Sequence, residues 1–234
     1  MVRKPYSCVW SGGRGCLLVL SGTGSSVGAT DRLGGVRPVT SSPVEDLAAL
    51  LAVAGDLVAG VRPDQWKNPT PCTDWNVREL VNHVVIGDRL FTAILRGEEP
   101  APPSARDPKS NDVLGDDPAG VQREGARELI AALSRPGVLD QMFQIPMGSV
   151  PGVAAAHMRS TEAIAHGWDL AQATGQEPRF PDDIVQRVLE FTRAKLADVP
   201  PDRTPFGPAQ PAPAGAPPIA ELVALLGRPV QPSA

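Results

Sequence analysis

The sequence predicts an all-α protein, an antiparallel helix bundle with long Pro-rich connections and a short C-terminal helix. Each segment with a strong hydrophobic pattern repeats its apolar residues at i, i+3, i+4 and i+7, the spacing of one helix face. Gly or Pro stands at or shortly after the end of each of these segments, where helices stop. The chain has no repeat of solenoid length, so we expect the helices to pack around one core.

The first helix is expected to begin at Pro43. Ser42 precedes it as a candidate N-cap, and Glu45 stands three residues later, which is the pattern of a capping box with Pro in the first helical position. The apolar repeat then continues to a stop near Gly60. This start signal and stop signal together define a helix of ordinary globular length.

The next two helices are separated by a polar loop. Thr73 or Asp74 can cap the second helix, which stops at Gly97. A segment rich in Pro, Asp and Ser over residues 98–117 follows, and a third helix is expected over 119–133.

The second half of the chain adds three more helices. The stretch 141–150 alternates too weakly to assign and is expected to be a short extended connector. A long helix is expected over 153–174 and another over 183–197. A Pro-rich arm over 200–217 then leads to a last short helix over 219–226.

The composition divides the chain into a tail and a bundle. Residues 1–42 contain Gly- and Ser-rich stretches, and we expect a disordered tail or a mis-assigned start codon there. The apolar run at 16–20 faintly resembles a secretory signal, but it is short and no Ala-x-Ala cleavage site follows. Residues 43–229 are expected to form the helix bundle.

Several functional classes are disfavoured by composition alone. The net charge of −4, with scattered Lys and Arg, argues against a nucleic-acid-binding surface. No apolar run approaches the roughly 18 residues of a membrane span. The 3 cysteines cannot form a disulfide framework, and the absence of a Cys-x-x-Cys pair excludes a thiolate zinc knuckle.

Three side chains have the chemistry and spacing of a metal site. Glu162 and His166 are four residues apart on the expected fourth helix, which places them about 40° apart on one face. Small and apolar neighbours indicate that this face is interior, where an unpaired carboxylate is costly. His83 on the second helix could complete a set of three N and O ligands, with positions left for water or substrate. Zinc would suit this set, although nickel, iron or manganese could occupy it.

These residues also have a simpler interpretation. Glu and His four residues apart are common, and a dry bundle with a Glu–His hydrogen bond would use the same side chains. His157 points to another side of its helix and is interpreted as a surface or packing residue.

Two separated motifs and a C-terminal signature resemble a known family. The segments are residues 69–83 (PTPCTDWNVRELVNH), 162–171 (EAIAHGWDLA), and 206–208 followed by 222–228 (FGP, LVALLGR). They resemble the actinobacterial metal-binding proteins related to the N-terminal domain of mycothiol-dependent maleylpyruvate isomerase, within the DinB/YfiT-like superfamily. The resemblance covers about residues 45 to 229 and leaves the first 42 without a counterpart.

The resemblance implies a cytoplasmic, DinB-like four-helix bundle with one divalent metal near one end. Its three ligands fall on His83, Glu162 and His166 here, the same three residues that the spacing selected. Asp169 follows His166 by three residues and could accept the far imidazole N–H or hold an arginine from another helix. It could equally be a partly exposed acid near the helix end.

Other reactive, aromatic or charged residues are interpreted mainly as structural. Cys72 lies just before a helix, where a thiolate is stabilised, but a small buried residue in a Pro-fixed turn is favoured. Trp75 and Trp168 are interpreted as structural. Arg159 could contact an anionic ligand, but a surface charge is favoured.

Three functions remain open. The resemblance implies an enzyme, a transferase or isomerase that joins mycothiol as its small-molecule thiol to an electrophilic substrate at the metal. A non-catalytic metal- or ligand-binding module is the second, because only a Pro- and Ala-rich stretch follows the fifth helix where the isomerases carry a further domain. The third is a metal-free bundle that forms a homodimer through a helix face.

Overall fold

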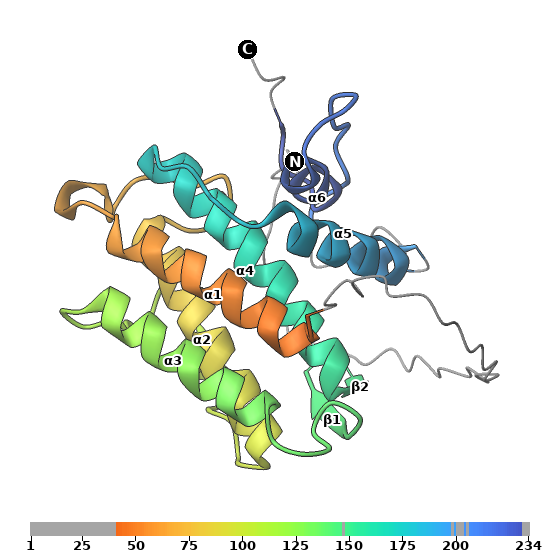
Figure 1. Cartoon of the computed structure of the whole chain (residues 1–234). Coiled ribbons are helices and arrows are strands. Elements are labelled where there is room, and N and C mark those ends of the chain that lie inside the picture. Colours follow the sequence, from red (N-terminus) through yellow and green to blue (C-terminus); the bar gives the residue numbers. More distant parts are fainter. Residues whose placement is uncertain (1–40, 147, 198, 200–203, 205, 231–234) are drawn as a thin grey trace, which may run out of the picture.

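The computed structural model describes residues 41–230 except 147, 198, 200–203 and 205 (Figure 1). Its helices are α1 Pro43–Ala59, α2 Val77–Arg96, α3 Pro118–Leu133, α4 Gly152–Thr174, α5 Asp182–Leu196 and α6 Pro218–Leu225. The other elements are the short 3-10 helices η1 Pro63–Gln65 and η2 Pro103–Arg106 and the strands β1 Met142–Ile145 and β2 Gly148–Pro151. The predicted all-α class is confirmed.

Four of the helices form the bundle. The helix α1 packs against α3 and α4, and α2 also packs against α3 and α4, so each helix has two neighbours in a closed ring. The helices α5 and α6 pack on each other and against α4, outside this ring (Figure 1). The helix α4 therefore lies between the bundle and the C-terminal pair of helices.

The starts of α1 and α2 differ in how well they were predicted. Ser42 and Glu45 form the expected capping box at α1. At α2 the cap is Asn76, which forms a capping box with Glu79, so the expectation of Thr73 or Asp74 was wrong. The reason lies upstream, where the Thr70 hydroxyl donates to the Cys72 and Trp75 carbonyls and prolongs the turn before α2 can begin.

The weakly patterned stretch before α4 forms a hairpin. The strands β1 and β2 are antiparallel, and Phe143 pairs with Val150. Phe143 and Ile145 alternate with exposed residues, which buries one face of β1. The expectation of a short extended segment is thus confirmed, with the addition that it folds back on itself.

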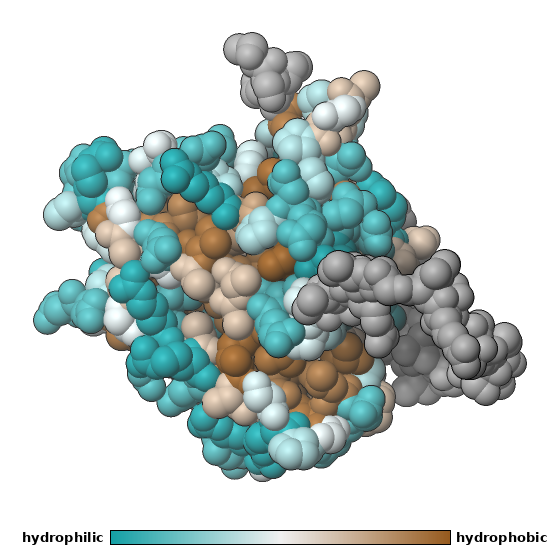
Figure 2. Space-filling model, viewed as in Figure 1, coloured by the Kyte–Doolittle hydropathy of each residue, from teal (hydrophilic) through white to brown (hydrophobic). Residues whose placement is uncertain are grey.

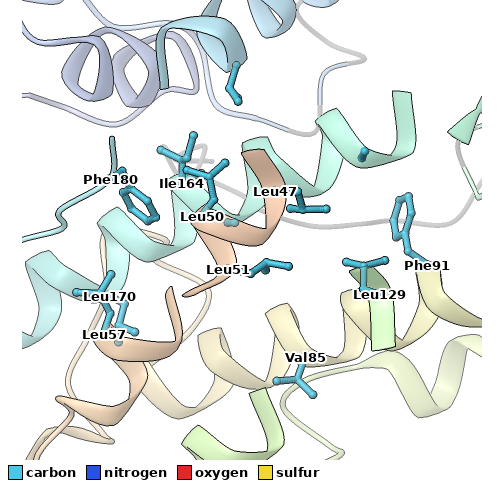
Figure 3. Close-up of a cluster of buried hydrophobic side chains, with 14 of the residues drawn as sticks. Leu47, Leu50, Leu51, Leu57, Val85, Phe91, Leu129, Ile164, Leu170 and Phe180 are labelled. Carbon is cyan, nitrogen blue, oxygen red and sulfur yellow. The ribbon is translucent and has the colours of Figure 1, made fainter. Parts of the chain in front are cut away.

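The core runs along the inside of the ring. Figure 3 shows side chains from all four helices meeting there, with Phe180 from the loop that precedes α5. The labelled members are Leu47, Leu50, Leu51, Leu57, Val85, Phe91, Leu129, Ile164, Leu170 and Phe180. This apolar packing holds α2 and α4, the helices that carry the candidate ligands, in the same bundle.

The outer surface is mixed. Figure 2 shows patches of apolar surface bordered by hydrophilic residues on the face that carries α1. Met142 is the one large hydrophobic residue among those described that is mostly exposed to solvent. No helix in the described part is long and apolar enough to span a bilayer. The expectation for residues 1–42 lies outside the described residues, apart from 41 and 42.

Candidate metal centre

The structure brings His83, Glu162 and His166 together between α2 and α4. His83 Nε2 and His166 Nε2 each lie 3.2 Å from the same carboxylate oxygen, Glu162 Oε2. One ligand atom from each residue lies within 4.8 Å of the others. Two separate helices thus converge on one carboxylate oxygen.

The spacing fits a bound metal ion. Ligand atoms held about 2.0–2.1 Å from a tetrahedral zinc ion lie about 3.3 Å from one another. The two 3.2 Å nitrogen–oxygen distances at Glu162 match that edge length. A small rotation of the side chains would let a divalent ion replace the shared hydrogen bonds, so this donor set fits such an ion.

The three side chains differ in exposure and protonation. His166 is 4% exposed, whereas His83 and Glu162 are 15% and 16% exposed, which leaves one side open to solvent. Burial alone would raise the pKa of Glu162, but hydrogen bonds from His166 and His83 outweigh it and hold that pKa well below its ordinary value. Burial lowers the pKa of His83.

The pKa of His166 moves the other way. Burial opposes its charge, but hydrogen bonds to Asp169 and Glu162 raise the pKa of His166 to about 9. At neutral pH both of its ring nitrogens therefore donate, one to each carboxylate. This places a positive charge between two acids without any metal.

Asp169 connects the centre to the C-terminal segment. Asp169 Oδ2 lies 3.1 Å from His166 Nδ1 and accepts from Arg228 Nη2 at 2.8 Å, while Oδ1 accepts from Arg228 Nε at 3.3 Å. Asp169 is fully buried and Arg228 nearly so. Both contacts that the sequence suggested for Asp169 are therefore present, and the arginine follows α6. A carboxylate on the far nitrogen of a ligand histidine fixes the ring and raises its basicity.

Comparisons with known proteins identify the family. The family model of the mycothiol maleylpyruvate isomerase N-terminal domain matches residues 47–171. An uncharacterised protein of Mycobacterium tuberculosis is 35% identical over 178 residues, which cover 75% of this chain and 91% of that protein. The chain belongs to the family of the mycothiol maleylpyruvate isomerase N-terminal domain.

More distant relatives agree with the fold. A second uncharacterised protein of Mycobacterium tuberculosis is 27% identical over 150 residues, 56% of each chain. The crystal structure of a histidine-to-alanine mutant of the mycothiol-dependent maleylpyruvate isomerase matches with a TM-score of 0.52 at 16% identity. That match covers 63% of this chain and 66% of the isomerase, and it shows a shared fold.

The family match contains the candidate ligands but ends before one contact residue. Residues 47–171 include His83, Glu162, His166 and Asp169. Arg228 lies beyond the matched region, 59 residues after Asp169. The arginine that holds Asp169 is therefore supplied by the segment that follows the family domain.

Two residues before α2 also reach the centre. Trp75 stacks on His83 with ring centroids 4.1 Å apart and meets His166 edge-on at 5.9 Å. Its structural interpretation therefore extends to packing against two candidate ligands. Cys72 is buried, as expected, but its sulfur lies within 4.8 Å of ligand atoms of His166 and Asp169. Sequence distance concealed this proximity, because the helix that carries His166 lies far along the chain.

Arg159 contradicts the expectation of a surface charge. Its side chain is 4% exposed and its guanidinium lies 2.9 Å from Asp88, which is 1% exposed. The sequence did carry a signal, which is the glycine at position 87 inside α2. In the structure, a Cβ at this position would lie 2.8 Å from Arg159 Nη1. A glycine inside a helix indicates close approach by another group.

His157 lies outside the centre. Its ring stacks on Phe191 of α5 with centroids 4.3 Å apart. The interpretation as a packing residue agrees with this contact. The residue therefore serves as a control position on the same helix as Glu162 and His166.

Proposed function

We propose that the chain binds one divalent cation, zinc above all, through His83, Glu162 and His166, and presents it to a small-molecule thiol. The observation that carries this proposal is the pair of 3.2 Å distances from two imidazole nitrogens to Glu162 Oε2. The partial exposure of His83 and Glu162 supports access from solvent for a further ligand.

The thiol proposed is mycothiol. This follows from family membership, because the family is named for a mycothiol-dependent isomerase domain. The protein would act as a transferase or isomerase that joins the thiol to an electrophile. A thiol cofactor kept reduced in the cell also makes a cytoplasmic location part of this proposal.

The chain's own charges favour an anionic ligand. Asp169 is paired with Arg228 and Asp88 with Arg159, so each pair is neutral. A divalent ion would displace the proton of His166, so Glu162 would be the one charged side chain beside the ion and one positive charge would stay unbalanced. A thiolate would neutralise it. When bound, a divalent ion supplies a lowered pKa for a coordinated thiol or water.

The side chains around the centre have distinct tasks in this proposal. Asp169 accepts the Nδ1–H of His166, so Nε2 of that ring is directed at the ion-binding position. Trp75 covers the face of His83 and excludes water from it. These contacts orient both histidines before any ligand arrives, which limits the entropy lost on binding.

Partial coverage of the isomerase favours one alternative. The chain spans 66% of the isomerase structure that it matches, so groups that the isomerase supplies elsewhere need not have equivalents. A module that binds metal and thiol without turnover is therefore the second candidate. Assays with mycothiol and a panel of electrophiles separate the two, since loss of electrophile faster than its uncatalysed reaction with the thiol occurs only with an enzyme.

The first test is the metal content of untagged protein. Wild type, His166→Ala and the control His157→Ala should be compared after purification and after reconstitution with zinc. We expect about one equivalent of metal in wild type and His157→Ala, and little in His166→Ala. Near-zero metal in all three after reconstitution would overturn the proposal and leave a bundle in which Glu162 pairs only with its histidines.

Thiol binding needs a second measurement. The wild-type protein should be loaded with cobalt(II), which reports its ligands through visible and near-ultraviolet absorption. Addition of mycothiol should produce a sulfur-to-cobalt band that is absent with a thioether analogue. An unchanged spectrum would contradict thiol binding at the metal but not metal binding itself.

A further inference from the structure

A buried ion pair joins the two helices that carry the candidate ligands. Arg159 of α4 donates from Nε to Asp88 Oδ1 of α2 at 3.0 Å, and its Nη2 lies 2.9 Å from the same oxygen. Nη2 also lies 3.3 Å from the carbonyl oxygen of Val84 on α2. The guanidinium thus contacts α2 at two successive turns.

These contacts are adjacent to the centre. Arg159 stands three residues before Glu162, one turn along α4. Val84 is the residue directly after His83 on α2. The contact from Arg159 to the Val84 carbonyl therefore fixes the backbone beside one ligand relative to the helix turn beside the other.

The pair is poorly arranged for stability alone. Asp88 Oδ2 and the hydroxyl of Thr92, one turn further along α2, are buried without a hydrogen-bond partner within the described part of the chain. Orphaned polar atoms cost stability, and a buried ion pair often contributes no more than apolar side chains of the same volume. A glycine at position 87 is also required to admit the guanidinium.

We propose that Asp88 and Arg159 are positioning residues that set the distance between α2 and α4 at the metal centre. Apolar side chains could fill the same space, but they would not fix the helices at one spacing. The directional contacts to Asp88 and Val84 do fix it, and they hold His83 within ligand distance of Glu162. This inference rests on the proposed metal site.

The test replaces the pair by apolar residues of similar volume. The double variant Asp88→Leu/Arg159→Met should keep the thermal stability of the metal-free protein, because removal of both partners leaves no charge uncompensated. Its zinc dissociation constant, measured by competition with a chromophoric chelator, should rise at least about tenfold. The visible spectrum of the cobalt(II) form should also shift, since the ligand geometry changes.

A second ion pair serves as the matched control. Arg187 of α5 and Asp46 of α1 also join two helices, with 2.8 Å contacts, but neither helix carries a ligand. The variant Asp46→Leu/Arg187→Met should bind zinc as wild type does. Equal zinc affinity and an unchanged cobalt spectrum in the Asp88→Leu/Arg159→Met protein would overturn the positioning role.

Two further results distinguish failure of the positioning role from failure of the proposed metal site. If the double variant does not fold, Arg159→Lys replaces it, because lysine keeps the charge but cannot reach Asp88 and Val84 together. Wild-type zinc affinity in Arg159→Lys would then overturn the inference. Failure of wild type itself to bind zinc would instead overturn the proposed function.

Discussion

At the scale of single residues, the proton on His166 decides how the candidate centre responds to pH above neutrality. Glu162 accepts from two histidines, and of these His166 holds its proton with a pKa of about 9. His83 has its pKa lowered by burial and is neutral at pH 7. A metal ion that binds Nε2 of His166 must therefore displace a proton at neutral pH.

This displacement predicts a pH-dependent zinc affinity. As pH rises from 7 towards the His166 pKa of about 9, the deprotonated fraction of His166 increases. Zinc affinity should therefore rise by up to about tenfold per pH unit between pH 7 and 9. Calorimetry in buffers of different ionisation enthalpy should find about one proton released at pH 7. An affinity independent of pH across this window would show that zinc does not bind His166.

A second prediction at this scale concerns Asp169. The variant Asp169→Asn keeps the shape but weakens the acceptor for His166 and leaves Arg228 buried without its acid. We expect zinc affinity to fall about 10- to 100-fold. Asp56→Asn, which alters an exposed acid near Arg123, should leave it unchanged. Equal zinc binding in both variants would deny Asp169 a role in orienting His166.

At the scale of elements, two helical glycines make a matched pair. A Cβ at Gly87 would lie 2.8 Å from the Arg159 guanidinium, whereas at Gly125 of α3 the nearest atom lies 4.0 Å away. Alanine favours a helix over glycine by about 1 kcal/mol. Gly125→Ala should therefore raise the midpoint of thermal unfolding, and Gly87→Ala should lower it by displacing Arg159. Scanning calorimetry of both variants tests this, and an equal rise in both would mean that Arg159 moves freely.

The elements were predictable because their signals are local. The apolar repeat and the capping box at Ser42 depend on residues within a few turns of one another. The start of α2 was misplaced because the Thr70 hydroxyl, not a property of Thr73 or Asp74, sets where the turn ends. Predictions of helix boundaries thus fail where a side chain outside the helix determines the boundary.

The candidate site was predictable in part for the same reason. Glu162 and His166 lie on one face of one helix, which spacing alone shows. Arg228 comes from a segment 59 residues after Asp169, and only the packing of α6 against α4 places it there. The pairing of Asp88 with Arg159 likewise depends on which helices are neighbours, so a charge assigned to the surface is buried.

At the scale of the whole molecule, the bundle and the C-terminal helices share one centre. The family domain supplies the candidate ligands and the following segment supplies Arg228. Arg228, which follows α6, therefore connects the C-terminal segment to the candidate metal centre through the buried carboxylate of Asp169. Any change that loosens this segment from α4 would release Asp169, and with it the orientation of His166.

The raised pKa of His166 predicts that rising pH lowers the stability of the metal-free protein but hardly changes that of the zinc-loaded protein. The folded-state pKa of His166, about 9, lies above its ordinary value of 6.5, so its contribution to stability is complete below pH 6.5 and is lost as pH rises through 9. The lowered pKa of Glu162 gives stability that is present above pH 4.5 and lost on acidification. The metal-free protein should thus unfold at a lower temperature at pH 9 than at pH 6.5.

Zinc should cancel most of this trend, because its affinity for the folded chain rises over the same window by about as much as the metal-free stability falls, and ligand binding stabilises in proportion to the logarithm of affinity. Thermal unfolding with excess chelator and with excess zinc at pH 6.5, 7.5 and 9 measures both slopes. His157→Ala should keep both, since that residue packs on Phe191 and not at the centre. In His166→Ala the metal-free slope should flatten and the zinc effect should vanish. If the metal-free slope persists in His166→Ala, another group carries the proton, and its assignment to His166 is wrong.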